Sequence, residues 1–211
     1  MPGSVEKVTA FITRPSGQGY ELLLVEHPHA GIQIPAGTVE DGEMPEEAVL
    51  REAAEETGLT SLSVRLYLGC AQSRLPEGQR MVARPTRVYA RPDTTSFDWA
   101  YLRKGIVVTV NRRAGGFSQV TYVEFDRVPQ PEYVTMCITG WVPDDALADM
   151  TERHFFHLEP NEGTEERWVV RADNHLFTLF WAPLGALPEI IPPQDGWLEF
   201  LHGQLPLPTQ R

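Results

Sequence analysis

Residues 37–59 read GTVEDGEMPEEAVLREAAEETGL. Pro45 predicts the first turn of a helix, because a residue in that position needs no amide hydrogen. Gly58 predicts the end of the same helix, because glycine readily takes the left-handed conformation found there. The helix is therefore expected to run to about Thr57. Residues 37–44, with their glycines and clustered acids, are not expected to form regular structure.

Three glutamates of this helix are expected to share one face. Residues at positions i, i+3 and i+4 are neighbours on a helix, so Glu52, Glu55 and Glu56 project together. Carboxylates this close repel one another unless a cation neutralises them. Mg²⁺ or Mn²⁺ takes such oxygen ligands and keeps waters that phosphate oxygens can replace. Arg51 is expected to pair with Glu43 and to hold the loop against the helix. The alternative is a solvated acidic helix face.

The spacing of the whole stretch favours the metal site over the solvated face. Written as G-x5-E-x7-R-E-A-x-E-E-x-G-L, it resembles the signature of the Nudix hydrolases, here called the Nudix box, at every position. The matching residues are Gly37, Glu43, Arg51, Glu52, Ala53, Glu55, Glu56, Gly58 and Leu59. The wider resemblance covers roughly residues 5–73 and 152–203, and the box is its most specific part.

The resemblance implies an α/β fold, namely an α/β/α sandwich with a mixed sheet. It implies a hydrolase that cleaves the pyrophosphate bond of a nucleoside diphosphate linked to another moiety, with Mg²⁺ or Mn²⁺ as cofactor. The metal ligands it implies are Glu52, Glu55, Glu56 and the backbone carbonyl of Gly37. The catalytic residues it implies are Arg51, Glu52, Glu55 and Glu162. Glu52 is favoured as base or ligand, and Glu162, on a distant loop, is the mobile alternative as base. The competing interpretation of Glu162 is a plain solvated loop acid.

The substrate is indicated only by residues outside the box. Pro76 lies one position from the place where ADP-ribose pyrophosphatases of this family carry a proline, which favours ADP-ribose or a nucleotide sugar. A loop proline is, however, usually only a turn residue. The candidates for phosphate contact are His27, His29, His154 and His157, although each taken singly is more often structural. Two alternatives stay open: a nucleotide-sensing protein of the same fold, and non-hydrolytic chemistry such as isomerisation.

Residues 76–151 differ from the rest of the chain. They hold several short extended runs without a convincing helix, and they are too many for a loop. We expect an inserted all-β module between residues 1–75 and 152–211, the two parts of a discontinuous Nudix domain. The run GWVP at residues 140–143 resembles a bacterial SH3-like barrel. A peptide partner of this insert would use the aromatic residues Trp99, Tyr101, Tyr122 and Trp141, which otherwise fill a core.

The composition narrows the classes of partner. Of 211 residues, 29 are acidic and 18 are Lys or Arg, giving a net charge of −11. This disfavours direct nucleic-acid binding and suits a small-molecule nucleotide held through a cation. Cys70 and Cys137 lie in apolar runs and are expected to be buried free thiols. No apolar run is long enough for a membrane span, and a cytoplasmic location is expected. A homodimer is left open.

Overall fold

The computed structural model describes residues 3–17, 19–128, 130–172 and 175–205. The chain divides into two compact units. The first, here called the β unit, comprises Met1–Glu6 and Ala71–Glu152. The second, here called the helix unit, comprises Lys7–Cys70 and Arg153–Arg211 and contains the Nudix box.

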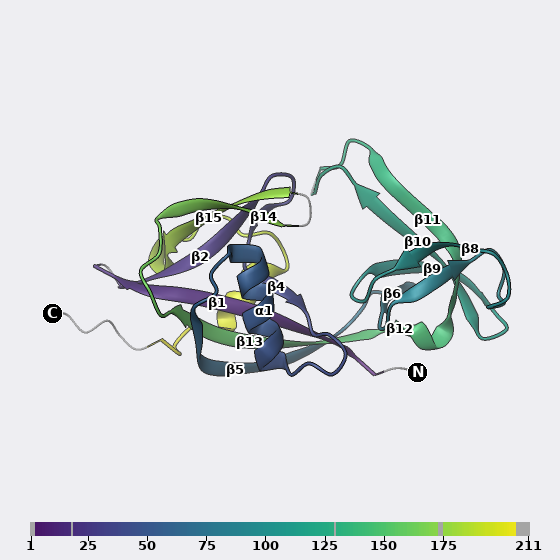
Figure 1. The fold of residues 1–211 in the computed structure, drawn as a ribbon, viewed down its shortest axis with the longest axis horizontal. Coiled ribbons are helices and arrows are strands. Elements are labelled where there is room, and N and C mark those ends of the chain that lie inside the picture. The colour runs from purple at the N-terminus through teal and green to yellow at the C-terminus, as the bar shows by residue number, and fades with distance from the viewer. Residues whose placement is uncertain (1–2, 18, 129, 173–174, 206–211) are drawn as a thin grey trace. The chain divides into compact units, whose positions relative to one another are not determined.

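The helix unit is built on one sheet (Figure 1). Its strands are β1 (Val5–Ser16), β2 (Gly19–His27), β3 (Gly31–Gln33), β4 (Ala36–Thr38), β5 (Leu62–Arg74), β13 (Met150–Pro160), β14 (Arg167–Ala172) and β15 (His175–Pro183). Its helices are α1 (Pro45–Thr57), α2 (Gln194–Trp197) and the 3-10 turns η2 (Leu184–Ala186) and η3 (Leu198–Phe200). The strand order is β14-β15-β2-β1-β13-β5, with β3 on β2 and β4 on β1.

The sheet is mixed, as predicted. Strands β1 and β2 pair antiparallel. Side-chain contacts between β1 and β13 join residues that follow one another in the same order along both strands, which indicates a parallel pair. Arg153 donates to the carbonyl oxygen of Val8 at 3.0 Å, and His157 lies 2.8 Å from the hydroxyl of Thr13.

Helical elements contact both faces of the sheet, and a mixed sheet with few helices fits a Nudix fold. On one face, Ala48, Val49 and Ala53 of α1 belong to the same buried cluster as alternate residues of β1, β2, β13 and β15. On the other face, the ring of Phe155 stacks on Phe200 of η3 at 3.9 Å. Because β2 lies between β1 and β15 under both layers, residues Leu22–Val25 are buried in an unbroken run.

The ends of α1 are confirmed, and part of the preceding segment is corrected. Pro45 is the first residue of α1, and Gly58 follows its last residue with a φ of 75°. Residues 37–44 were expected to lack regular structure, but Gly37 and Thr38 belong to β4. This short strand pairs antiparallel with Lys7–Thr9 of β1. Strand β1 is long and offers backbone hydrogen-bond partners to β4. The residue types of β4 do not themselves indicate this pairing.

The β unit contains the predicted all-β segment. Its elements are β6 (Gln79–Val82), β7 (Thr86–Tyr89), β8 (Asp98–Leu102), β9 (Val107–Ala114), β10 (Phe117–Phe125), β11 (Val134–Pro143), η1 (Asp144–Ala146) and β12 (Leu147–Ala148). They form a curled antiparallel sheet in the order β12-β6-β9-β10-β11-β7-β8. The all-β character is confirmed, and the SH3-like barrel stays a prediction.

The four aromatic residues considered for a peptide groove are divided between surface and core. Trp99 and Tyr101 are 46% and 59% exposed, whereas Trp141 is only 6% exposed beneath the guanidinium of Arg112. Tyr122 packs against the buried cluster of the sheet. A peptide partner therefore stays a prediction. Within the part of the chain that the structure describes, no helix has the length and apolar character needed to cross a membrane.

Candidate active site

Arg51 joins the loop before α1 to the helix. Its guanidinium donates to both carboxylate oxygens of Glu43, at 2.8 and 2.9 Å, and to the carbonyl oxygen of Thr38 at 3.0 Å. The two side chains are 26% and 16% exposed, so solvent weakens this two-point contact less than it would at an open surface. The hydrogen bonds to Glu43 raise the pKa of Arg51 above its ordinary value, so the guanidinium stays charged. The predicted pair is confirmed.

Glu52 is pressed against the backbone of Gly37. Its Oε1 atom accepts a hydrogen bond from the amide of Thr38 at 3.1 Å and lies 3.0 Å from Nη1 of Arg51. A Cβ atom on Gly37 would lie 1.8 Å from the carboxyl carbon of Glu52 and 2.2 Å from Oε1. A side chain at position 37 would therefore displace the Glu52 carboxylate from this place. Glycine leaves the space that the carboxylate occupies.

Glu56 and Glu55 complete the acidic face of α1. Oε2 of Glu56 accepts a hydrogen bond from the amide of Ala36 at 3.1 Å, so Glu52 and Glu56 hold the main chain on both sides of Gly37. Glu55 is 59% exposed, with Arg51 at 3.4 Å. Carboxylate oxygens and a main-chain carbonyl are donors of the kind that Mg²⁺ and Mn²⁺ prefer, so the chemistry of these donors fits the implied cofactor. The roles of Glu52, Glu55, Glu56 and Gly37 as metal ligands stay a prediction.

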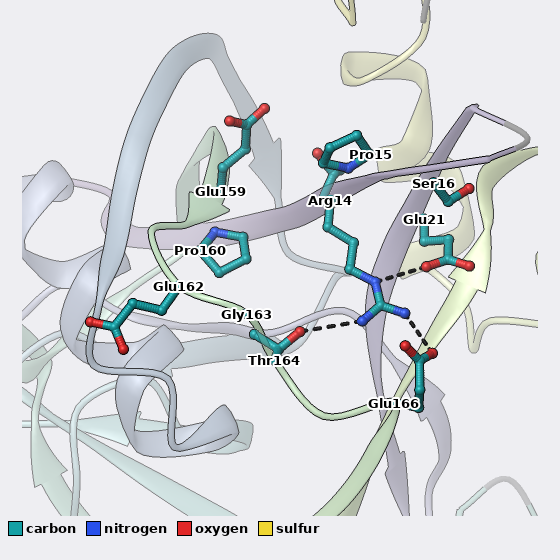
Figure 2. Close-up of a pocket in the computed structure, with 11 residues that line it drawn as sticks. Arg14, Pro15, Ser16, Glu21, Glu159, Pro160, Glu162, Gly163, Thr164 and Glu166 are labelled. Carbon is teal, nitrogen blue, oxygen red and sulfur yellow. Dashed lines mark hydrogen bonds and ion pairs between the residues drawn. The ribbon is translucent and has the colours of Figure 1, made fainter. Parts of the chain in front are cut away.

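Glu162 lies elsewhere in the helix unit. It borders a cavity of about 520 Å³ beside the end of β1 and the loop between β13 and β14. Figure 2 shows Arg14 in this cavity, bonded to Glu21 at 2.8 Å and to Glu166 at 2.5 Å. No described residue of the Nudix box lines the cavity. Glu162 therefore borders a cavity to which the box does not contribute, and its role as a base stays a prediction.

Two of the four candidate histidines make side-chain contacts between strands of the sheet. His157 is buried with Nε2 at 2.8 Å from the hydroxyl of Thr13, and its burial lowers its pKa below the ordinary value. Nδ1 of His154 lies 3.0 Å from the hydroxyl of Tyr67. These contacts favour the structural reading of both residues. His27 and His29 lie instead at the far end of β2, beside His175.

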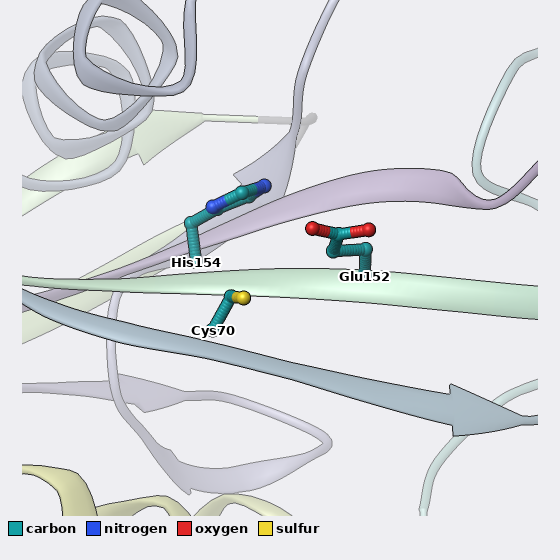
Figure 3. Close-up of side chains that lie close together, drawn as sticks. All are labelled: Cys70, Glu152 and His154. Carbon is teal, nitrogen blue, oxygen red and sulfur yellow. The ribbon is translucent and has the colours of Figure 1, made fainter.

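The predicted burial of the two cysteines is wrong, because both are exposed free thiols. Figure 3 shows Cys70 on β5 next to His154 on β13. Strand β5 is the last strand in the order of its sheet, so no further strand covers it. Cys137 lies on β11 in a run of exposed residues, Val134–Cys137. An apolar sequence run therefore did not indicate burial at either place.

Two contacts that position the site were not expected. Nζ of Lys7 donates to the hydroxyl of Thr38 at 2.7 Å, which attaches β4 to β1 by a side chain as well as by the backbone. Nε1 of Trp168 donates to the carbonyl oxygen of Thr57 at 2.7 Å, so β14 holds the C-terminal end of α1. Both partners lie far from the box in sequence, and only the strand order brings them to it. The sequence offers no local signal for either contact.

Comparison with known proteins agrees with this geometry. The family model described as NUDIX domain matches residues 4–135, more than half of the chain. A Bacillus subtilis (strain 168) protein named "Putative 8-oxo-dGTP diphosphatase YtkD" is 49% identical over 51 residues, which are 24% of this chain. The match spans 32% of the length of that relative. The family match ends before β13, β14 and β15, which the structure adds to the same sheet as the box. The chain belongs to the Nudix family.

Proposed function

We propose that the chain is a metal-dependent hydrolase that cleaves the pyrophosphate bond of a nucleoside diphosphate linked to another moiety. The observation that carries the proposal is the packing of the Glu52 carboxylate into the space where Gly37 lacks a side chain. A solvated acidic helix face would not need this arrangement. Here one carboxylate is held by a backbone amide and by Arg51, and a second holds the neighbouring amide of Ala36.

The residues of the box divide into those that hold the cofactor and those that position them. Glu52, Glu55, Glu56 and the Gly37 carbonyl would hold Mg²⁺ or Mn²⁺, which when bound neutralises pyrophosphate charge and lowers the pKa of a bound water. Arg51 is a positioning residue, because its contacts are to Glu43, Thr38 and the glutamates.

The general base is proposed to be Glu52, with Glu162 as the alternative. Glu52 belongs to the box and is held by the Thr38 amide, whereas Glu162 borders the cavity on the loop between β13 and β14. A Glu162→Gln variant distinguishes the two residues. If Glu52 is the base, this variant retains turnover; if Glu162 is the base, turnover falls by about 10²–10⁴-fold while metal binding persists.

Two observations bear on the substrate and indicate different nucleotides. The Bacillus subtilis relative is named for 8-oxo-dGTP. Pro76 and the IPAGTVEDGE segment favour ADP-ribose or a nucleotide sugar. All of these compounds contain the P–O–P bridge that the carboxylate site is suited to cleave. The proposal therefore specifies the bond and leaves the leaving group to a substrate panel.

The test is Mg²⁺-dependent hydrolysis of ADP-ribose, nucleotide sugars and 8-oxo-dGTP, with the products separated and identified. The variant is Glu56→Gln, and the matched control is Glu46→Gln, an exposed glutamate in the first turn of α1. We expect turnover of at least one compound, loss of nearly all of it in Glu56→Gln, and retention in Glu46→Gln. Full activity of Glu56→Gln would overturn the assignment. Nucleotide binding without turnover would favour a sensing protein.

A further inference from the structure

Three histidines of the helix unit gather at one end of its sheet. His27 ends β2, His29 follows in the next loop, and His175 begins β15. The ring centroids of His27 and His175 lie 5.0 Å apart, those of His29 and His175 5.9 Å, and those of His27 and His29 6.2 Å. Strands β2 and β15 are neighbours in the sheet, so strand pairing brings His175 next to His27 and His29.

The cluster extends the core on the side of the sheet that α1 covers. Side chains alternate along a strand, so His27 points to the same face as Leu23 and Val25, which pack in the buried cluster beneath α1. His175 likewise precedes Phe177 by two residues on that face, and the His27 ring lies 5.1 Å from the Phe177 ring. His27 and His175 therefore lie against the apolar ring of Phe177.

The environment keeps His27 neutral. Burial, and then the nearby His175 and His29, lower its pKa below the ordinary value. Neutral imidazole is the form that binds metal ions. Nδ1 of His27 accepts a hydrogen bond from the backbone amide of His29 at 3.0 Å, so Nε2 carries the proton in this arrangement. Binding of an ion through Nε2 moves that proton to Nδ1 and releases the amide of His29 to water.

The ring centroids lie about as far apart as those of three histidines that hold one ion, but the ring nitrogens would have to turn toward a common point. A Zn–N distance of about 2.0–2.1 Å places each ring centroid roughly 3.2 Å from the ion, and two centroids at a tetrahedral angle then lie about 5.2 Å apart. The observed 5.0–6.2 Å therefore requires rotation of the rings, mainly of the exposed His29, and little movement of the strands. Imidazole nitrogen suits Zn²⁺, Ni²⁺ and Cu²⁺, whereas the box carboxylates suit Mg²⁺ and Mn²⁺.

We propose that His27, His29 and His175 form a second metal site, which takes a divalent transition-metal ion such as Zn²⁺ and leaves a coordination position to water or another ligand. The site shares no residue with the box. It lies toward the C-terminal end of α1, because His27 adjoins Phe177, Phe177 pairs with Val170, and Val170 lies next to Gly58.

The test is the Zn²⁺ affinity of the full chain in excess Mg²⁺, measured by competition with a chromophoric chelator. Thiols also bind Zn²⁺, so Cys70 and Cys137, both exposed, are first replaced by serine. In this background, His29→Ala and His175→Ala are compared with His202→Ala, an exposed histidine outside the cluster. Imidazole NMR spectra identify the histidines that respond to Zn²⁺.

We expect one Zn²⁺ per chain, with affinity at least tenfold weaker in His29→Ala and in His175→Ala and unchanged in His202→Ala. The imidazole signals of all three cluster histidines should shift on addition of Zn²⁺. Equal Zn²⁺ affinity in all variants, or NMR shifts confined to other histidines, would overturn the proposal. Because the readout is metal binding in excess Mg²⁺, failure of this site leaves the proposed hydrolase activity unaffected, and the reverse also holds.

Discussion

Replacing Gly37 by alanine separates the role of Gly37 in the site from its role in the fold. The new Cβ atom would lie 1.8 Å from the carboxyl carbon of Glu52, so this flexible side chain must turn away. Turning away breaks its bond to the Thr38 amide and its contact with Arg51. Loss of the charged hydrogen bond to the Thr38 amide alone is worth about 2 kcal/mol, which lowers Tm by roughly 4–8 °C for a chain of this size.

The effect of the same substitution on turnover should be much larger than its effect on stability. Displacement of a reacting group by about 1 Å can cost 10²-fold in rate, and we expect at least that loss in kcat. Thermal unfolding and steady-state kinetics measure the two effects. Gly42→Ala is the control, because Gly42 has a φ of +84° and nothing lies within 4 Å of its added Cβ. This variant should lose about 1–2 kcal/mol through backbone strain and keep its activity.

A double-mutant cycle tests the cause directly. In a Glu52→Ala background the clash is gone, so Gly37→Ala should then change the free energy of unfolding very little. If the two substitutions destabilise the protein additively, or if Gly37→Ala retains wild-type kcat, the steric account of this glycine is refuted.

Three further predictions concern other parts of the site and its support. Arg51→Lys replaces the two-point contact to Glu43 by a single charge. The variant should still fold, and its kcat should fall about 10–100-fold, whereas an unchanged kcat would contradict the positioning role. Trp168→Phe removes the bond to the Thr57 carbonyl and should lower the free energy of unfolding by about 1 kcal/mol in urea titrations, which an unchanged midpoint would disprove. Burial lowers the pKa of His157 in the folded chain, so below about pH 6.5 the unfolded chain binds more protons than the folded chain. The free energy of unfolding should therefore fall as the pH drops from about 6.5 through the pKa that His157 has in the folded chain. Comparison of wild type with His157→Gln in unfolding at several pH values isolates this slope, and an equal slope in both would refute it.

The sequence predicts the helix and its chemistry well because the signals are local. Pro45 and Gly58 mark the two ends of α1 by backbone rules that act within one turn. The spacing of Glu52, Glu55 and Glu56 depends only on helical geometry. The Arg51–Glu43 pair is also predictable, because both residues lie within the same loop and helix.

Features that depend on strand pairing are much less predictable. Strand β4 forms because β1 lies beside it, and Gly37 and Thr38 do not themselves favour a strand. The exposure of Cys70 follows from the place of β5 at the end of the sheet order. The cluster of His27 with His175 joins residues at opposite ends of the chain, and each histidine taken singly reads as structural.

The most direct test of the central claim is binding of Mn²⁺, followed by electron paramagnetic resonance, in the presence of a non-hydrolysable nucleoside diphosphate analogue. If the carboxylates of α1 hold the ion that acts on the pyrophosphate, wild type and Glu46→Gln should bind Mn²⁺ equally. Glu56→Gln should bind it at least tenfold more weakly, in line with the loss expected when a metal site is disturbed. Equal Mn²⁺ binding by all three proteins would contradict the account.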